Sequence, residues 1–388
     1  MDFPYKHINV LAMPTDFCNM NCVYCFNSRR THTVEDVMCD DVLSKMFQIT
    51  IPYYEKVTFI WHGGEPLSMG LDFFSKVIAL QEEVNTTNTI VRNSIQSNLT
   101  LLDVDYAKNL LDLGYHIGGS YDGTQNKLTR GCDSAIIKGH DAIVEAGGKN
   151  GVICVVQSRN VDHLIEDYEW FKTRGISYTL NAYLTEPPYE NDDLYVEPDH
   201  FVSKAIELYD YWVRDPSCNI GIDYFMVFVD YFLFKRKTMC CYTSCLGKYV
   251  GIHRNGDISP CNRDFPKKYY FGNVADYTDI HECFFSDGFD RLAKAAVSRR
   301  KRCMNCKIYD FCNGGCNNNA LLQGDITKAG GFSCQILIPV YEHIERSIEE
   351  IKTESLDELA KRCNPRVFDA LKRYNDICLE DEPLKEQR

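Results

Sequence analysis

Three cysteines near the start of the chain have the spacing of a metal-cluster loop. Cys18, Cys22 and Cys25 stand in the string CNMNCVYC, close behind the first strand-like run. Iron–sulfur cubanes are held by four thiolates, so a compact loop with three can hold a cubane and leave one iron open to a substrate or cofactor. Structural zinc is normally closed by four ligands, and the odd total of 19 cysteines does not suit a complete disulfide framework. The spacing therefore favours an open iron–sulfur site.

This loop resembles the cluster-binding loop of the radical S-adenosylmethionine (SAM) superfamily, which has the same Cys-x-x-x-Cys-x-x-Cys spacing and an aromatic residue before the third cysteine. Tyr24 fills the aromatic position. The resemblance implies that the open iron chelates the amino and carboxylate groups of SAM, and that reductive cleavage yields a 5'-deoxyadenosyl radical. The radical would then remove a hydrogen atom from the substrate. In such enzymes the cofactor carries the difficult chemistry.

The cysteine loop needs a scaffold, and the first two hundred residues have the pattern of one. Runs rich in β-branched and aromatic residues alternate with longer amphipathic stretches, which is typical of βα units and a parallel sheet. The expected strands are His7–Met13, Lys56–His62, Thr89–Ser97, His116–Tyr121, Gly151–Val156 and Ser177–Ala182. Six units predict an α/β fold built on a partial (β/α)6 barrel of the TIM type.

A glycine-rich turn and several polar residues follow these strands, at the end where barrels of parallel strands carry their active sites. In chain order they are Gly63, Gly64, Glu65, Pro66, Asn98, Ser120, Gln157 and Asn181. Alone, a GGEP string is more often an ordinary turn, and polar residues are common at strand ends. Behind a cysteine loop, GGEP resembles the superfamily's GGE motif, which contacts the amino group of SAM. The segment SYDG and Arg130 resemble its ribose and carboxylate contacts, so we predict that these residues and Tyr24 bind the cofactor.

A second group of cysteines lies in the last third of the chain. Its members are Cys245, Cys261, Cys303, Cys306, Cys312, Cys316 and Cys334. Seven thiols exceed the needs of one tetrahedral site, so two metal centres are the simplest explanation. Together with the strings FGNV and GGC, the spacing resembles the SPASM domain, an auxiliary-cluster module of peptide-modifying radical enzymes.

The SPASM resemblance implies two auxiliary clusters, and thus three 4Fe–4S clusters in all. One would be bound by Cys303, Cys306, Cys312 and Cys334, and the other by Cys245, Cys261 and Cys316. For the remaining ligand we predict Cys241, because Cys-x-x-x-Cys is a workable chelate span. Cys240 and a thiolate of the substrate are the alternatives.

These patterns divide the chain into three parts. We expect a barrel over residues 1–225, a small cysteine-rich SPASM domain over residues 235–340 and a helical extension over residues 341–388. The interleaved charges beyond Pro339 predict helix with a break at Asn364-Pro365.

Composition excludes some classes of partner. The formal net charge of -13 argues against nucleic acid. The longest apolar run, Tyr224–Phe234, is too short to span a membrane and contains Asp230, so it predicts a buried helix. The first residues lack the pattern of a signal peptide, and many cysteines without one indicate a reducing cytoplasm.

The function that these features favour is peptide modification by a radical SAM enzyme. Such an enzyme abstracts hydrogen from a ribosomally synthesised peptide and forms a cross-link, which can be a thioether, carbon–carbon or carbon–heteroatom bond. The runner-up is an anaerobic sulfatase-maturating enzyme, which oxidises cysteine or serine to formylglycine. In that family an aspartate follows the second SPASM cysteine and is interpreted as the base. Here Asn262 stands there, and Asp264 is the candidate base.

A non-catalytic iron–sulfur electron carrier is a more distant alternative, because it would not need GGEP, SYDG and Arg130 around an open cluster. Only seventeen residues precede Cys18, which leaves no room for an amino-terminal winged-helix domain that grips leader peptides. We therefore expect either a separate leader-recognition protein or direct binding of the substrate. Flavodoxin or ferredoxin is the expected reductant.

Overall fold

The structure, a computed structural model, describes residues 5–25, 33, 36–149, 151–185 and 192–381. The chain forms two compact units. Unit 1 comprises Met1–Tyr121, Asn126–Val152 and Ser244–Ser298, and unit 2 comprises Asp122–Gln125, Ile153–Thr243 and Arg299–Arg388. Each unit thus combines segments from the barrel region with segments from the cysteine-rich region.

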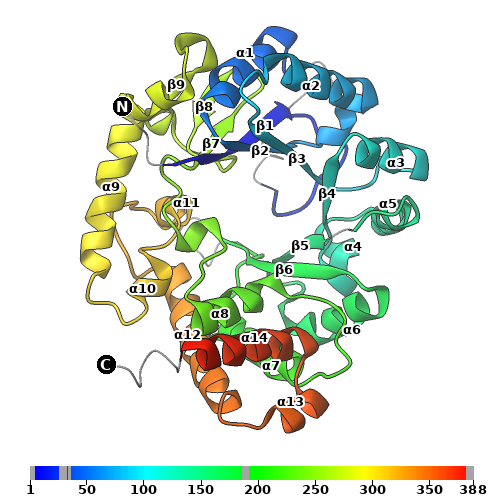
Figure 1. Cartoon of the computed structure of the whole chain (residues 1–388), viewed down its shortest axis with the longest axis vertical. Helices are drawn as coiled ribbons and strands as arrows, with labels where there is room; N and C mark the ends of the chain where they lie inside the picture. The colour runs from blue at the N-terminus through cyan, green and yellow to red at the C-terminus, as the bar shows by residue number, and fades with distance from the viewer. Residues whose placement is uncertain (1–4, 26–32, 34–35, 150, 186–191, 382–388) are drawn as a thin grey trace. The chain divides into compact units, whose positions relative to one another are not determined.

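Unit 1 is built on a mixed sheet (Figure 1). Its strands are β1 (His7–Thr15), β2 (Lys56–Gly63), β3 (Ile90–Ser97), β4 (Tyr115–Ser120), β7 (Tyr249–Ile252), β8 (Asp257–Ser259) and β9 (Gly272–Asn273). They are ordered β4-β3-β2-β1-β7-β8-β9. β1 to β4 are parallel, and β7 adds to β1 in parallel, whereas β8 and β9 run antiparallel to their neighbours.

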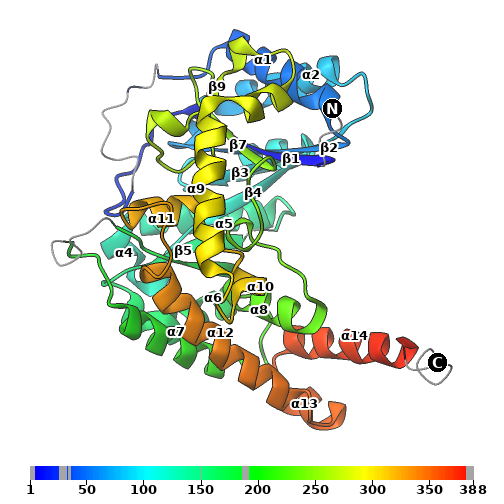
Figure 2. The ribbon, with the colours of Figure 1, turned by 90° about the vertical axis from the view of Figure 1, so that its left-hand side faces the viewer.

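Helices cover one face of this sheet. Those of unit 1 are α1 (Asp40–Thr50), α2 (Gly70–Val84), α3 (Val104–Asp112), α4 (Asn126–Thr129), α5 (Asp133–Glu145) and most of α9 (Asp287–Cys303). Figure 2 shows α1 and α2 on the same side of β1 and β2. On that side Trp61 makes edge-on contacts with Phe47 of α1 and Phe73 of α2. Because side chains alternate along a strand, the same face carries the fully buried Val10 and Ile117.

The opposite face of the sheet is only half-buried and carries polar side chains beside Leu11 and Ile60. It presents His7, Thr58, His62, Ser94, Gln96 and Ser120 from four neighbouring strands. His7 and Thr58 are hydrogen-bonded across β1 and β2 at 3.2 Å. A closed TIM barrel fills its interior with layers of branched apolar side chains. This face instead carries polar side chains from four strands.

Unit 2 carries most of β5 (Gly151–Val156), β6 (Ser177–Ala182) and a layer of helices (Figure 1). The helices are α6 (Leu164–Arg174), α7 (Pro198–Val213), α8 (Asp223–Phe234), α10 (Tyr309–Cys312), α11 (Asn317–Leu322), α12 (Phe332–Ile351), α13 (Leu356–Arg362) and α14 (Pro365–Asp381). α7 and α12 are joined by hydrogen bonds from Tyr209 to Ser347 at 3.1 Å and between His343 and Asp210 at 2.7 Å. Short 3-10 helices over both units are Ile51–Tyr53, Pro66–Met69, Gly123–Gln125, Val161–His163, Cys240–Tyr242, Lys267–Tyr269, Val274–Asp276 and Ile280–Phe285.

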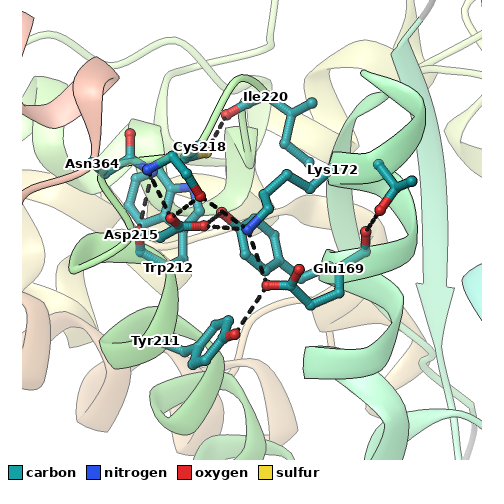
Figure 3. A network of polar contacts seen from close by, with 11 residues as sticks. Glu169, Lys172, Tyr211, Trp212, Asp215, Cys218, Ile220 and Asn364 are labelled. Atoms are coloured by element: carbon teal, nitrogen blue, oxygen red, sulfur yellow. Dashed lines mark hydrogen bonds and ion pairs between the residues drawn. The ribbon is translucent and has the colours of Figure 1, made fainter.

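A network of charged side chains fastens α6 to the end of α7 (Figure 3). Lys172 Nζ lies 2.8 Å from Asp215 and 3.2 Å from Glu169, and the hydroxyl of Tyr168 donates to Asp215 at 2.7 Å. Burial raises the pKa of Asp215, but donors led by Lys172 outweigh it and hold that pKa at about 2. Asp215 therefore stays ionised and stabilises this part of unit 2.

The predicted α/β class is confirmed by the parallel strands and the helices that alternate with them. The strands expected at Gly151–Val156 and Ser177–Ala182 have those bounds, and the other four differ by one or two residues at their ends. The apolar run at Tyr224–Phe234 forms the buried α8, and α14 begins at Pro365 as the predicted break requires. The division at residues 225, 235 and 340 stays a prediction. Among the helices that the structure describes, none has the length and apolar character needed to cross a bilayer.

Candidate cofactor and cluster sites

The cysteine loop begins where β1 ends and is held by the GGEP turn. Gly64 N donates to Thr15 O at 2.9 Å, and Glu65 N donates to Phe17 O at 2.7 Å. A Cβ on Gly64 would lie 2.0 Å from Phe17 O, which real contacts do not allow. Glycine at this position is therefore required for the turn to lie against the loop.

Arg254, from the β7–β8 hairpin, fixes the same loop from another direction. Its Nε donates to Asp16 Oδ2 at 2.9 Å, and its Nη2 lies 3.0 Å from Asp36 Oδ1. Asp16 precedes the three cysteines and Asp36 follows them. One guanidinium thus bridges the two ends of the segment that carries Cys18, Cys22 and Cys25.

Glu65 is buried, and both of its carboxylate oxygens accept hydrogen bonds. Oε1 accepts from Leu67 N at 2.9 Å and from Ser97 Oγ at 2.8 Å, while Oε2 accepts from Asn98 N at 2.8 Å. Burial raises the pKa of Glu65, and the hydrogen bonds and the nearby Arg130 oppose that rise. Because every one of these partners donates, the group is a carboxylate. Glu65 therefore shapes the end of β3; its contact with the SAM amino group stays a prediction.

Asn98 links this carboxylate to the cysteine loop. Its Nδ2 donates to Cys18 Sγ at 3.8 Å and to Asn19 Oδ1 at 2.9 Å, and its Oδ1 accepts from Thr100 Oγ1 at 2.7 Å. Burial, with Glu65 and Cys25 nearby, raises the pKa of Cys18, and the bond from Asn98 opposes this. A residue predicted to bind the cofactor thus touches a predicted cluster ligand directly.

Tyr24 and Arg130 also come together. Arg130 Nη1 donates to Tyr24 OH at 2.7 Å, and Val23 N donates to Thr129 O at 3.0 Å. The segment after β4 therefore lies against the cysteine loop, as cofactor contacts from both would require. Ser120, at the end of β4, accepts from Gln96 Nε2 at 3.0 Å.

His62 is a feature of this site that the sequence reasoning missed. Gly63 N donates to His62 Nδ1 at 2.7 Å, so Nδ1 is the bare nitrogen and Nε2 carries the hydrogen. Burial and the charge of Arg263 lower the pKa of His62 to about 4. The imidazole is therefore a neutral hydrogen-bond donor on the polar face of the sheet. Its position directly before GGEP was the available signal.

The remaining predicted cofactor residues lie in unit 2. Gln157 is fully buried, and its Oε1 accepts from Arg159 N at 2.9 Å, so it shapes the turn after β5. Asn181 is half-buried near the end of β6. Asp122 of SYDG accepts from Val155 N at 2.9 Å, which is a structural role.

Four cysteines gather within unit 2. Burial and the neighbouring Cys334 and Cys303 raise the pKa of Cys312 to about 12, and burial with Cys334 and Cys306 raises that of Cys303. Gly330 N donates to Cys334 Sγ at 3.3 Å. The thiols that were predicted to bind one auxiliary cluster are therefore neighbours that suppress one another's ionisation.

This grouping suits an iron–sulfur cluster, because bound iron would neutralise thiolates that otherwise repel one another. Within the described ranges, no three His, Cys, Asp or Glu side chains converge as ligands of a single metal ion. A cubane spreads its four thiolates over four irons and needs a wider arrangement. The donor set thus fits the predicted 4Fe–4S cluster.

The other auxiliary set is divided between the units. In unit 2, burial raises the pKa of Cys241, with Cys240 and Cys316 among its neighbours, whereas Cys240 is exposed. In unit 1, Cys245 and Cys261 are half-buried. The assignment of Cys241 as the remaining ligand stays a prediction. Asp264, the predicted base, is exposed three residues after Cys261.

Family profiles match both regions. The profile of the radical SAM superfamily matches residues 13–171, and that of the SPASM iron–sulfur cluster-binding domain matches residues 240–307. The chain is 26% identical over 345 residues to the cysteine-type anaerobic sulfatase-maturating enzyme of Clostridium perfringens, covering 84% of this chain and 93% of that protein.

Solved structures share the fold. The structure of anSMEcpe with bound AdoMet has a TM-score of 0.81 at 24% identity, covering 89% of this chain and 98% of that one. Streptococcus suis SuiB bound to its precursor peptide SuiA has a TM-score of 0.60 at 16% identity, covering 84% of this chain and 75% of that one. Both likenesses concern the fold.

Proposed function

Because the chain carries a radical SAM domain followed by a SPASM domain, we propose that it oxidises a cysteine or serine side chain of a peptide or protein to formylglycine. The predicted enzyme class and its cofactors, SAM and 4Fe–4S clusters that include auxiliary ones, are confirmed by the matched domains. The observation that carries the proposal is the continuous similarity over 345 residues to an anaerobic sulfatase-maturating enzyme. This reverses the order favoured by the sequence, where peptide cross-linking came first.

The proposed oxidation removes two electrons from the side chain. When bound, the amino-terminal cluster and SAM supply a 5'-deoxyadenosyl radical, which takes one hydrogen atom from the substrate Cβ. A proton from the thiol or hydroxyl passes to a base, and an auxiliary cluster, when bound, would take up the second electron. Serine then gives the aldehyde directly, whereas cysteine gives a thioaldehyde that water converts to the aldehyde with release of hydrogen sulfide.

The residues of the chain have separate roles in this scheme. Cys18, Cys22 and Cys25 bind the catalytic cluster, and Asn98 holds Cys18 through its 3.8 Å contact. Arg130, which donates to Tyr24, is the proposed contact of the SAM carboxylate. Pro66, Gly63, Gly64, Ser120, Gln157 and Asn181 remain proposed cofactor contacts.

Asp264 is the proposed base, because Asn262 cannot accept the proton. Asn262 is also the observation that keeps peptide cross-linking as a second candidate. Thioether or carbon-linked products need the same radical but place the new bond within the peptide.

An anaerobic assay separates the two candidates. The reconstituted enzyme is incubated with SAM, dithionite and a peptide that contains one cysteine, and with the matched serine peptide. We expect replacement of sulfur by oxygen with loss of two hydrogens in the cysteine peptide, loss of two hydrogens in the serine peptide, and in both an aldehyde that hydrazine traps. A loss of two hydrogens without a trappable aldehyde would instead establish a cross-link. The variant with Cys18, Cys22 and Cys25 changed to alanine is the control.

The partners follow from the same proposal. A protein reductant, flavodoxin or ferredoxin, supplies the electron for SAM cleavage. A separate leader-recognition protein belongs to the cross-linking candidate. Pull-down of a candidate substrate peptide by the isolated enzyme tests this, since a tight complex would remove the need for a helper.

A further inference from the structure

Arg299 is a buried cation beside the four cysteines of unit 2. It lies near the end of α9, four residues before Cys303, and is only 1% exposed. Lys301 and Arg302 on the same turn are exposed. A charged side chain is rarely buried to this degree unless it is held by partners, so the surroundings of Arg299 need an explanation.

The guanidinium organises the segments that carry the cysteines. Nε donates to Gly314 O at 2.8 Å and Nη2 to Gly315 O at 3.3 Å. Nη2 also donates to the side-chain oxygen of Asn317, and Nη1 donates to Ile326 O. The first three acceptors surround Cys316 in sequence, and the fourth precedes Cys334. The planar fork of arginine suits several simultaneous acceptors, which a lysine ammonium does not match.

The charge of Arg299 also reaches the thiols. Cys303 follows Arg299 by four residues on α9, so the two side chains lie on the same face of the helix. Gly315, whose carbonyl accepts from the guanidinium, lies beside Cys312, because a Cβ added to it would be 3.7 Å from Cys312 Sγ. The guanidinium is therefore close enough to stabilise negative charge at this group of sulfurs.

We propose that Arg299 raises the reduction potential of the auxiliary cluster bound by Cys303, Cys306, Cys312 and Cys334. A 4Fe–4S cluster with four thiolates is anionic, and reduction adds a further negative charge. Net charge, hydrogen bonds and solvent exposure set such potentials. A buried cation acts through a weaker dielectric than an exposed one, so it favours the reduced form.

This inference rests on the proposed function, in which an auxiliary cluster accepts an electron from the substrate radical. A higher potential makes that cluster a better acceptor. Arg299 is a positioning and tuning residue in this scheme, because it acts on the cluster and not on the substrate.

The test is a redox titration followed by electron paramagnetic resonance. The background is the full chain with Cys18, Cys22 and Cys25 changed to alanine, so that only auxiliary clusters give signals. Arg299→Gln should lower the reduced-to-oxidised ratio at a fixed potential by about tenfold, which equals about 59 mV for one electron. Arg302→Gln, which removes an exposed charge on the same turn, should leave the ratio unchanged.

A second variant decides the matter if Arg299→Gln fails to retain iron. Asn317→Asp keeps the acceptor for Nη2 but places a carboxylate against the guanidinium, so it should lower the ratio in the same direction. Asn375→Asp at an exposed position on α14 is its matched control and should leave the ratio unchanged.

Two results would overturn the inference. One is an unchanged ratio in iron-loaded Arg299→Gln or, where that variant holds no iron, in Asn317→Asp relative to Asn375→Asp. The other is absence of auxiliary iron and sulfide from the background protein, which would remove the cluster assignment itself. Neither readout depends on peptide oxidation, so a failure of the proposed reaction is distinguishable from a failure of this inference.

Discussion

The two cysteine sites differ in the charge that surrounds them. Near Cys18 the buried neighbour is the Glu65 carboxylate, which accepts from Ser97 and Asn98. Near Cys303 the buried neighbour is the Arg299 guanidinium. A nearby anion disfavours reduction of a cluster, and a nearby cation favours it. The first environment therefore suits a strong electron donor to SAM, and the second suits an electron acceptor.

The largest effect is expected when the amino-terminal cluster is removed and the auxiliary clusters are kept. Changing Cys18, Cys22 and Cys25 to alanine should abolish production of 5'-deoxyadenosine while the auxiliary iron remains. Iron and sulfide analysis with nucleoside chromatography measures both. Loss of all iron would contradict the independence of the two sites.

Glu65→Gln should remove the anion and leave donors at Leu67 and Ser97 poorly paired. We expect a higher potential of the amino-terminal cluster and SAM cleavage about tenfold slower, a factor equal to about 1.4 kcal/mol. Unfolding free energy should fall by about 1–3 kcal/mol, the cost of unsatisfied buried groups. Redox titration and urea unfolding are the measurements, and the exposed Glu82→Gln is the control. If the potential of the amino-terminal cluster were unchanged or lower, the Glu65 charge would not be what distinguishes the two sites.

Arg254→Met should loosen the cysteine loop without changing the sign of the charge at Cys18. The two ion pairs to Asp16 and Asp36 are partly buried, so their loss should cost about 1 kcal/mol. We expect less iron in the amino-terminal site and no change in the potential of the auxiliary clusters. Arg92→Met, at an exposed position on β3, is the control. If both variants held equal iron, Arg254 would not be needed to hold the cysteine loop in a cluster-binding conformation.

Asp215→Asn should have the smallest redox effect, because its network does not include the cluster cysteines. Its pKa lies at about 2 in the folded protein and 3.8 ordinarily, which corresponds to about 2 kcal/mol of stability at neutral pH. Since the folded pKa is depressed, this contribution is present above pH 3.8 and lost as pH falls towards 2. Urea unfolding of iron-free protein at pH 7 and pH 3 measures it. A shift in the reduction potential of the auxiliary clusters would show that local stability, and not the nearby charge, determines that potential.

Much of the scaffold was predictable because strands and their polar ends are local patterns. The six βα units and the glycine requirement before Glu65 follow from short strings. The spacing of the cysteines likewise indicated how many centres to expect. These short sequence motifs do not show which side chains, distant in sequence, contact them in the folded protein.

The unpredicted contacts of the amino-terminal cysteine loop join residues far apart in sequence. Arg254 meets Asp16 across the sheet, and Asn98 meets Cys18 from the end of β3. Arg299 was missed because a basic residue on an amphipathic helix ordinarily faces solvent. β7 was missed because it has four residues and pairs with β1, not with a sequence neighbour.

The pairing of Asn9 with Tyr249 has a consequence for biogenesis. β1 lies between β2 and β7, so the sheet gains its last parallel neighbour only after some 240 residues of further synthesis. At about 5–20 residues per second, the ribosome needs roughly 12 to 50 seconds to supply it. The guanidinium of Arg254, on the turn behind β7, arrives equally late. Iron delivery to the amino-terminal cysteines should therefore be post-translational, with the nascent chain depending on chaperones or on anaerobic conditions until the carboxyl-terminal third has emerged.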